Sequence, residues 1–210
     1  MIIAVDGTAA SGKGTLAKHL ATRLDLAYLD TGSLYRAVGL SLARAGYKTT
    51  EITPDVAADA ARRLSDDLMA DPALRSAETG QIASIVAAVP DVRAELLDYQ
   101  RQFANNHPPG TKGAVLDGRD IGTVVLPDAD AKFFVDADID VRASRRHREL
   151  LDAGASLSLA EVKAQLEERD RRDKTRAHAP LIPAEHAIFV DTSAKNIEEM
   201  VAFALSALMR

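Results

Sequence analysis

A glycine-rich segment at residues 7–15, which reads G-T-A-A-S-G-K-G-T, constrains the fold of this chain more than any other feature. Residues 2–5, just before it, form an unbroken apolar run that predicts a strand buried on both faces. After it, leucines recur at helical spacing, at Leu16, Leu20 and Leu24. Strand, glycine turn and helix in this order make a cradle for phosphate, because backbone N–H groups turn inward and the helix adds its positive N-terminus. The alternative is an ordinary strand-to-helix turn that needs glycine only for its shape.

The residue types of this segment fit the phosphates of a nucleotide. Lys13 supplies a mobile cation that can follow a phosphoryl group during transfer, so we expect it to be catalytic. We expect the nucleotide to be held by Gly7, Thr8, Ala9, Ala10, Ser11, Gly12, Lys13, Gly14 and Thr15. The pattern alone does not distinguish a GTPase, a motor ATPase and a small-molecule kinase, but the chain has no N-K-x-D motif for reading guanine.

Four further short apolar runs predict strands, and each is followed by an aspartate. They are residues 27–29, 114–116, 132–135 and 187–190, followed by Asp30, Asp117, Asp136 and Asp191. Helical patterns separate the runs, and helix starts are recognisable at Thr53-Pro54, at Asp138 and at the capping box of Ser158 and Glu161. This alternation predicts an α/β fold with a parallel sheet. Residues 53–106 contain only helical patterns and therefore suit a substrate lobe outside the sheet.

Composition excludes several classes of function. The net charge of −5 provides no global basic field, so we expect neither nucleic acid nor a membrane surface as a partner. With no cysteine among the 210 residues, thiol nucleophiles, thiolate metal sites and disulfides are excluded. Residues 1–5 lack the basic region of a leader peptide, and no apolar run approaches the roughly 20 residues that span a bilayer. We expect a cytoplasmic protein.

Two segments that follow predicted strands suggest a second ligand site. Residues 30–36 read D-T-G-S-L-Y-R, and residues 116–120 read L-D-G-R-D. Open α/β sheets bind ligands at the carboxyl edge, where both segments would lie. An arginine there can hold a phosphate with two hydrogen bonds, whereas an aspartate accepts hydrogen bonds and suits a donor such as an exocyclic amine. Taken singly, each segment could also be an ordinary solvated loop.

Five motifs along the chain resemble those of the bacterial cytidylate kinases, a family of nucleoside monophosphate kinases. Besides residues 7–15 and 30–36, they are S-I-V-A-A-V-P-D-V-R at 84–93, D-G-R-D-I-G-T-V-V-L-P-D-A at 117–129, and E-R-D-R-R-D-K-T-R at 168–176. The run that begins at Asp117 is the most specific of the five. Gly14, which departs from the commonest form of the phosphate loop, is normal in this group.

The resemblance implies a site for CMP, and for dCMP, with distinct roles for its residues. Arg36 and Arg119 would hold the phosphate, while Asp173 and Arg176 would contact the sugar and phosphate region. The remaining implied contacts are Thr31 and the cytosine-reading residues Ser84, Arg93 and Asp120. The role of Asp120 agrees with the chemistry, since N4 of cytosine donates a hydrogen bond where O4 of uracil accepts one.

Residues 142–176 are rich in arginine and resemble the lid of these kinases. The resemblance implies that Arg142 contacts the adenine of ATP and that three further arginines approach the transferring phosphates: Arg146, Arg169 and Arg172. A mobile cationic hairpin would match the dispersed charge of phosphoryl transfer and exclude water. The alternative is a solvated charged hairpin, because acidic residues are spaced to pair with these arginines.

The expected metal is Mg²⁺, bridging phosphate oxygens of ATP. Thr15 would touch it directly and Asp117 through water. Asp117 could instead only cap the turn that follows its strand.

These observations predict a P-loop α/β kinase with a three-layer α/β/α architecture and a five-stranded parallel sheet of order 2-3-1-4-5. The single kinase domain, 1–210, would comprise a core (1–52, 107–141 and 177–210), an NMP-binding insert (53–106) and a lid (142–176). The insert is reduced, because the stretch 64–75 is short and helix-like where longer family members carry strands. The expected reaction is in-line transfer from ATP to CMP or dCMP by a monomer.

Two other functions remain open at this point. Another small P-loop kinase could use a sugar acid, shikimate or a different nucleotide as its acceptor, and a nucleotide-sensing protein could bind without turnover. Asp120, Ser84 and Arg93 favour CMP as the acceptor, and Lys13 with the lid arginines favours turnover.

Overall fold

The computed structural model describes residues 1–209, the side chain of residue 66 aside. Five parallel strands form one sheet in the order β2-β3-β1-β4-β5, which confirms the predicted topology. The strands are β1 (Ile2–Gly7), β2 (Ala27–Asp30), β3 (Ala114–Gly118), β4 (Ala131–Asp136) and β5 (Ile188–Asp191). All but β1 and β3 end at the expected aspartate, and those two continue one residue beyond it. Parallel register brings these aspartates to one edge of the sheet.

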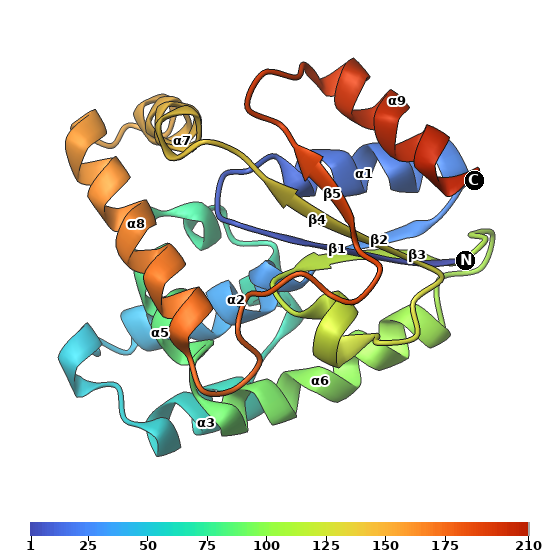
Figure 1. Ribbon diagram of the computed structural model, residues 1–210. Helices are drawn as coiled ribbons and strands as arrows, with labels where there is room; N and C mark the ends of the chain where they lie inside the picture. Colours follow the sequence, from blue (N-terminus) through green and yellow to red (C-terminus); the bar gives the residue numbers. More distant parts are fainter. Residues whose placement is uncertain (210) are drawn as a thin grey trace. The chain divides into compact units, whose positions relative to one another are not determined.

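One face of the sheet is covered by α1 (Lys13–Leu24) and α9 (Ile197–Leu208), which pack side by side (Figure 1). Ile3 and Val5 of β1 point to this face, where they meet Leu16 and Leu20 of α1. On the other face, η3 (Ile121–Val125), a single π-helical turn, contacts β1 and β3. Cover on both faces explains why the strands are continuous apolar runs.

The arginine-rich stretch forms a helical hairpin of α7 (Ile139–Asp152) and α8 (Leu159–Thr175). The backbone N–H of Asp140 donates to the Asp138 side chain at the start of α7, and Ser158 and Glu161 form the predicted capping box of α8. Gly154 adopts φ +82° in the turn between them, a conformation that favours glycine. The predicted starts of both helices are therefore confirmed.

Contacts within the chain divide it into two units, Met1–Asp30 with the chain from Gln100 onward, and Thr31–Tyr99. The secondary-structure elements of the second unit's described residues are all helices, and the unit is built around α2 (Thr31–Arg44) and α5 (Ala77–Val86). Its other elements are η1 (Thr49–Glu51), α3 (Pro54–Arg62), α4 (Asp66–Met69), η2 (Pro72–Arg75) and the start of α6 (Pro90–Asn105). This unit begins at Thr31, whereas the insert was expected from residue 53. The division into core, insert and lid stays a prediction.

No helix within residues 1–209 combines the length and the apolar character needed to span a membrane.

Candidate active site

The loop between β1 and α1 is held open by two glycines. Gly7 has φ +153°, and a Cβ there would lie 1.9 Å from the carbonyl oxygen of Val135. Gly12 has φ +88° and precedes α1 without any side-chain cap from the described chain. The first N–H groups of α1 are therefore not consumed by a capping side chain, which suits an anion at this helix end.

Hydroxyl groups fix the shape of this loop. Thr8 donates from Oγ1 to Oδ1 of Asp136 at the end of β4, at 2.6 Å. Ser11 donates from Oγ to the carbonyl oxygen of Thr8, at 3.0 Å. Both hydroxyls belong to fully buried residues, so they serve the loop's structure.

Lys13 lies in a cluster of opposing charges at the carboxyl edge of the sheet. Burial and the nearby Arg119 lower the pKa of Lys13, while Asp117 and Asp30 act in the opposite direction. Burial likewise raises the pKa of Asp117, and Lys13 opposes that rise. A cation with a depressed pKa beside buried carboxylates indicates a functional site rather than a solvated turn.

Gly14 has a steric role beside this cluster. A Cβ at residue 14 would lie 2.9 Å from Oδ2 of Asp117. Glycine therefore lets the carboxylate of Asp117 lie this close to α1 without a shift of that side chain.

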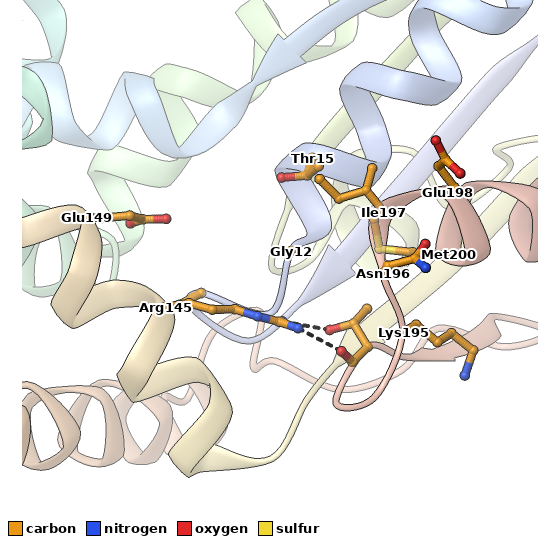
Figure 2. A pocket seen from close by; sticks show the side chains of 11 residues that line it. Gly12, Thr15, Arg145, Glu149, Lys195, Asn196, Ile197, Glu198 and Met200 are labelled. Atoms are coloured by element: carbon orange, nitrogen blue, oxygen red, sulfur yellow. Dashed lines mark hydrogen bonds between the residues drawn. The ribbon is translucent and has the colours of Figure 1, made fainter. Parts of the chain in front are cut away.

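A cavity of about 610 Å³ opens beside the phosphate loop (Figure 2). The loop contributes Gly12 and the start of α1 contributes Thr15, α7 contributes Arg145, and the first turn of α9 contributes Ile197 and Met200. The other lining residues are Ala10, Glu149, Thr192, Lys195, Asn196 and Glu198. The cavity is thus continuous with the helix end that suits phosphate, and its size fits a nucleoside.

Arg145 and Thr192 join three segments around this cavity. Arg145 donates to Oγ1 of Thr192 at 3.0 Å and to its carbonyl oxygen at 2.7 Å (Figure 2). Thr192 donates from Oγ1 to the carbonyl oxygen of Ser11 in the loop, at 2.6 Å. Neither Arg145 nor Thr192 was identified from the sequence. A signal for Thr192 was available in the sequence, because this residue comes directly after the aspartate that follows the predicted strand 187–190. The segments at 30–36 and 116–120 were identified by their similar place at the end of a strand.

Arg142, the arginine expected to bind the cofactor, does not line this cavity. Its side chain is 6% exposed and pairs with Asp170 of α8 at 2.7 Å. It also donates to the carbonyl oxygen of Ala137 at 2.9 Å and to that of Ala9 in the loop at 3.3 Å. Arg142 thereby ties both helices of the hairpin to the phosphate loop, and its contact with a base stays a prediction.

Four of the expected substrate-binding residues lie together in the unit that contains the sheet. Nε of Arg119 contacts Oδ2 of Asp173 at 2.9 Å. Arg169 approaches the same carboxylate at 3.9 Å, and Arg176 lies 3.8 Å from Oδ1 of Asp120. Burial by itself would raise the pKa of Asp173, but its three arginine neighbours hold that pKa below the usual value. Distant segments therefore do form a charged cluster.

The other two expected lid arginines pair with acidic neighbours of their own helices. Arg146 contacts Glu149 at 3.1 Å, and Arg172 lies 3.6 Å from Glu168. This is the pairing that the alternative of a solvated hairpin anticipated. Both side chains are partly exposed, so such pairs contribute little to stability.

The remaining expected substrate residues belong to the unit Thr31–Tyr99. Arg36 donates to the carbonyl oxygen of Leu74 at 3.1 Å, and its guanidinium lies against Gly80. Arg93 donates to the carbonyl oxygen of Ala87 at 3.1 Å and stacks over the ring of Tyr35. Thr31 is the buried first residue of α2.

Ser84 of α5 is buried, and its Oγ makes no hydrogen bond within the described chain. A buried hydroxyl without a protein partner is costly unless a ligand satisfies it. This observation fits the expected contact of Ser84 with a substrate.

The oxygen-rich surroundings of the loop fit Mg²⁺ held mainly by a nucleotide. Mg²⁺ at phosphates needs only one or two protein oxygens, which Thr15 and Asp117 could provide. No group of three or more histidine, aspartate or glutamate side chains is arranged as a metal site among residues 1–209. The chain therefore fits a metal that arrives with the nucleotide.

Comparisons with known proteins agree with this geometry. A family model described as cytidylate kinase matches residues 3–210. The cytidylate kinase of Paramagnetospirillum magneticum is 53% identical, over 97% of this chain and 95% of that protein. The cytidylate kinase of Rhodospirillum rubrum is 50% identical, over 99% and 97% respectively.

Solved structures support the fold alone. An uncharacterized protein from Eubacterium ventriosum has a TM-score of 0.58 at 14% identity, over 100% of this chain and 98% of that one. A sugar kinase from Janibacter has a TM-score of 0.52 at 13% identity, over 99% and 94%. The full-length match to the family model and the close relatives confirm the resemblance: this chain belongs to the cytidylate kinase family.

Proposed function

We propose that the chain transfers the γ-phosphoryl group of ATP to CMP, giving ADP and CDP, and that it also accepts dCMP. The observation that carries this proposal is the charge cluster around Lys13. Arg119 and Arg169, expected to bind the acceptor and the transferring phosphates, lie close enough to Lys13 to lower its pKa. Cations from the donor site and from the acceptor site thus influence one another, as in-line transfer requires.

ATP would place its phosphates on the loop and its adenosine in the neighbouring cavity. The cavity begins at Gly12 and Thr15, so a triphosphate on the loop leads directly into it. Thr15 and Asp117 would hold Mg²⁺. When bound, Mg²⁺ neutralises charge on the β and γ oxygens of the nucleotide.

CMP would be recognised by the residues that the resemblance implies. Arg119 and Arg36 would bind its phosphate, and Asp173 and Arg176 would contact the sugar and phosphate region. Thr31 would complete the contacts, and Ser84, Arg93 and Asp120 would read the cytosine. An aspartate that accepts from N4 of cytosine would face O4 of uracil in UMP, and two acceptors opposed in a buried site would cost about 1–3 kcal/mol.

Catalysis by this arrangement is positioning and charge stabilisation. A phosphate oxygen of CMP is already a competent nucleophile, so no strong general base is needed. Lys13 would follow the transferred group, and Arg146, Arg169 and Arg172 would stabilise its charge. The pairs of Arg146 with Glu149 and of Arg172 with Glu168 are partly exposed and weak enough to exchange for phosphate contacts.

A coupled assay of ADP release tests the proposal across CMP, dCMP, UMP, AMP and gluconate as acceptors. We expect CMP and dCMP to exceed UMP by about tenfold or more in kcat/KM, since one mismatched buried hydrogen bond has roughly that effect. Gluconate should give no ADP above background. A preference for UMP or for gluconate would refute the assignment, and tight binding of ATP and CMP without turnover would favour a sensor.

A further inference from the structure

Asp6, at the carboxyl end of β1, makes two buried hydrogen bonds to a distant turn. Its side chain accepts from the backbone N–H of Ile121 at 2.7 Å and from that of Gly122 at 2.8 Å. Asp6 is 2% exposed, so these bonds form away from solvent. The two N–H groups belong to the residues that directly follow Asp120, the proposed reader of cytosine.

The hydrogen bond from Gly122 takes over a task that Asp120 would otherwise perform. Asp120 is the N-cap residue of η3, and its carbonyl oxygen accepts from the N–H of Val124 and of Val125. An aspartate at an N-cap ordinarily accepts a hydrogen bond from the N–H of the second or third residue of its own helix, which here are Gly122 and Thr123. Here the side chain of Asp120 makes no capping hydrogen bond in the described structure, and it lies 3.8 Å from Arg176 instead.

The backbone on both sides of Asp120 is fixed. Before it, Gly118 of β3 is in register with Asp6 of β1. After it, the N–H of Gly122 donates to Oδ2 of Asp6, and a Cβ at residue 122 would be crowded by Cβ of Ala184 at 3.1 Å. Asp6 therefore holds the start of the segment that carries Asp120 through its backbone strand and the end of that segment through its carboxylate.

We infer that Asp6 is a positioning residue for acceptor specificity: it binds the N–H of Ile121 and that of Gly122, the second of which Asp120 would otherwise cap, and so directs the carboxylate of Asp120 toward the base of the acceptor. The inference rests on the proposed role of Asp120 in reading CMP. Asp6 touches neither substrate in this account and acts only through the turn at 120–122.

Burial of the Asp6 carboxylate has an electrostatic cost, which an uncharged side chain at this position would not have. Burial raises the pKa of Asp6 to about 6, against the opposing effect of its two amide hydrogen bonds. A neutral residue would avoid this cost. The geometry of the turn gives a reason for retaining a carboxylate with two acceptor oxygens at this position.

The test compares CMP and UMP as acceptors for the full-length protein and its Asp6→Asn variant. Asparagine keeps the shape but presents an N–H₂ group to one of the two amides, so the turn loses a hydrogen bond. We expect the ratio of kcat/KM for CMP to that for UMP to fall about tenfold, mainly through KM for CMP, with KM for ATP changing far less. Asp6→Ser, which adds no opposing donor, is the second variant should Asp6→Asn fail to fold.

Asp136→Asn is the matched control. Asp136 also ends a strand and also holds backbone and side-chain donors, accepting from Oγ1 of Thr8 and from the N–H of Ala137. It supports the ATP loop, so its variant should alter KM for ATP and leave the CMP:UMP ratio unchanged. A fall of that ratio in Asp136→Asn equal to the fall in Asp6→Asn would overturn the inference, because the effect would then be general.

A double-mutant cycle with Asp120→Asn separates the inference from the proposed function. If Asp6 acts through Asp120, adding Asp6→Asn to Asp120→Asn will change the CMP:UMP ratio no further. Additive effects, or an unchanged ratio in Asp6→Asn while Asp120→Asn lowers it, would overturn the role of Asp6 alone. An unchanged ratio in Asp120→Asn would instead refute the reading of cytosine by Asp120 and the inference with it.

Discussion

Lys13 is the side chain that would connect the proposed donor and acceptor sites. Its pKa is lowered by burial and by Arg119 and is supported by Asp117 and Asp30. The positive charge is therefore supported by two carboxylates, one of which, Asp117, is also proposed to hold Mg²⁺. A lysine in this setting stabilises developing charge on a phosphoryl group more strongly than one in water would.

Lys13→Ala should lower kcat by about 100- to 1,000-fold, because one charge interaction realised in the transition state is lost. The fold should survive, since the glycines and hydroxyls that shape the loop remain. Initial-rate kinetics and thermal denaturation of both proteins provide the measurement. Unchanged turnover by a folded Lys13→Ala protein would remove the central role assigned to this residue.

For single residues, the sequence predicted those whose role can be recognised within one continuous segment of the chain. The loop residues could be identified because glycine spacing and Lys13 belong to one continuous segment. Asp6 and Thr192 could not, because each acts through partners more than 100 residues away, Ile121 and Ser11 respectively. Their roles depend on which strands are neighbours, and no local pattern records that.

The α7–α8 hairpin is the element in which the role of an arginine depends most on its position around the helix. Arg142 points inward to Asp170 and the loop, whereas Arg145, three residues later, reaches the cavity. Capping residues predicted the starts of these helices correctly. The sequence could not indicate which side of α7 faces the loop, because arginines occur on several sides of it.

Arg142→Ala should lower the free energy of unfolding by about 3–5 kcal/mol, the usual effect of leaving one partner of a buried ion pair unpaired. Asp170 would then be a buried carboxylate without its cation. Arg148→Ala, at an exposed position of the same helix, is the control and should change stability by less than about 0.5 kcal/mol. Urea unfolding measures the free energy of unfolding of both variants. Equal effects in the two variants would show that the buried pair does not anchor the hairpin.

For the whole molecule, the buried carboxylate of Asp6 makes stability depend on pH. Its pKa is about 6 in the folded protein against an ordinary value of 3.8, so the folded state binds the proton more tightly. The stabilisation that tighter proton binding by Asp6 gives to the folded state is full below about pH 4 and is lost as pH rises through 6. From pH 5 to pH 7, the free energy of unfolding of the wild-type protein should fall by roughly 1 kcal/mol more than that of the Asp6→Asn variant.

Urea unfolding of both proteins at pH 5 and pH 7 gives this difference directly, because the other titrating groups are common to the two. An equal change in both proteins would mean that Asp6 keeps an ordinary pKa in the folded state.

The sheet could be predicted as a whole because each strand is short, apolar and followed by an aspartate. The grouping of the helices could not. The chain forms a helical unit from Thr31, so α2, which follows a strand, groups with the helices of residues 53–99. Leu34 and Val38 of α2 pack against Ile82 and Val86 of α5, and that pairing is a property of the folded chain.

The central claim is that the protein selects a cytosine nucleotide as its acceptor through Asp120. Calorimetric titration of the wild-type protein with CMP and with UMP tests this most directly. We predict that CMP binds about tenfold or more tightly than UMP and that Asp120→Ala removes most of that difference. Equal affinity of the wild-type protein for the two nucleotides, or tighter binding of UMP, would contradict the account.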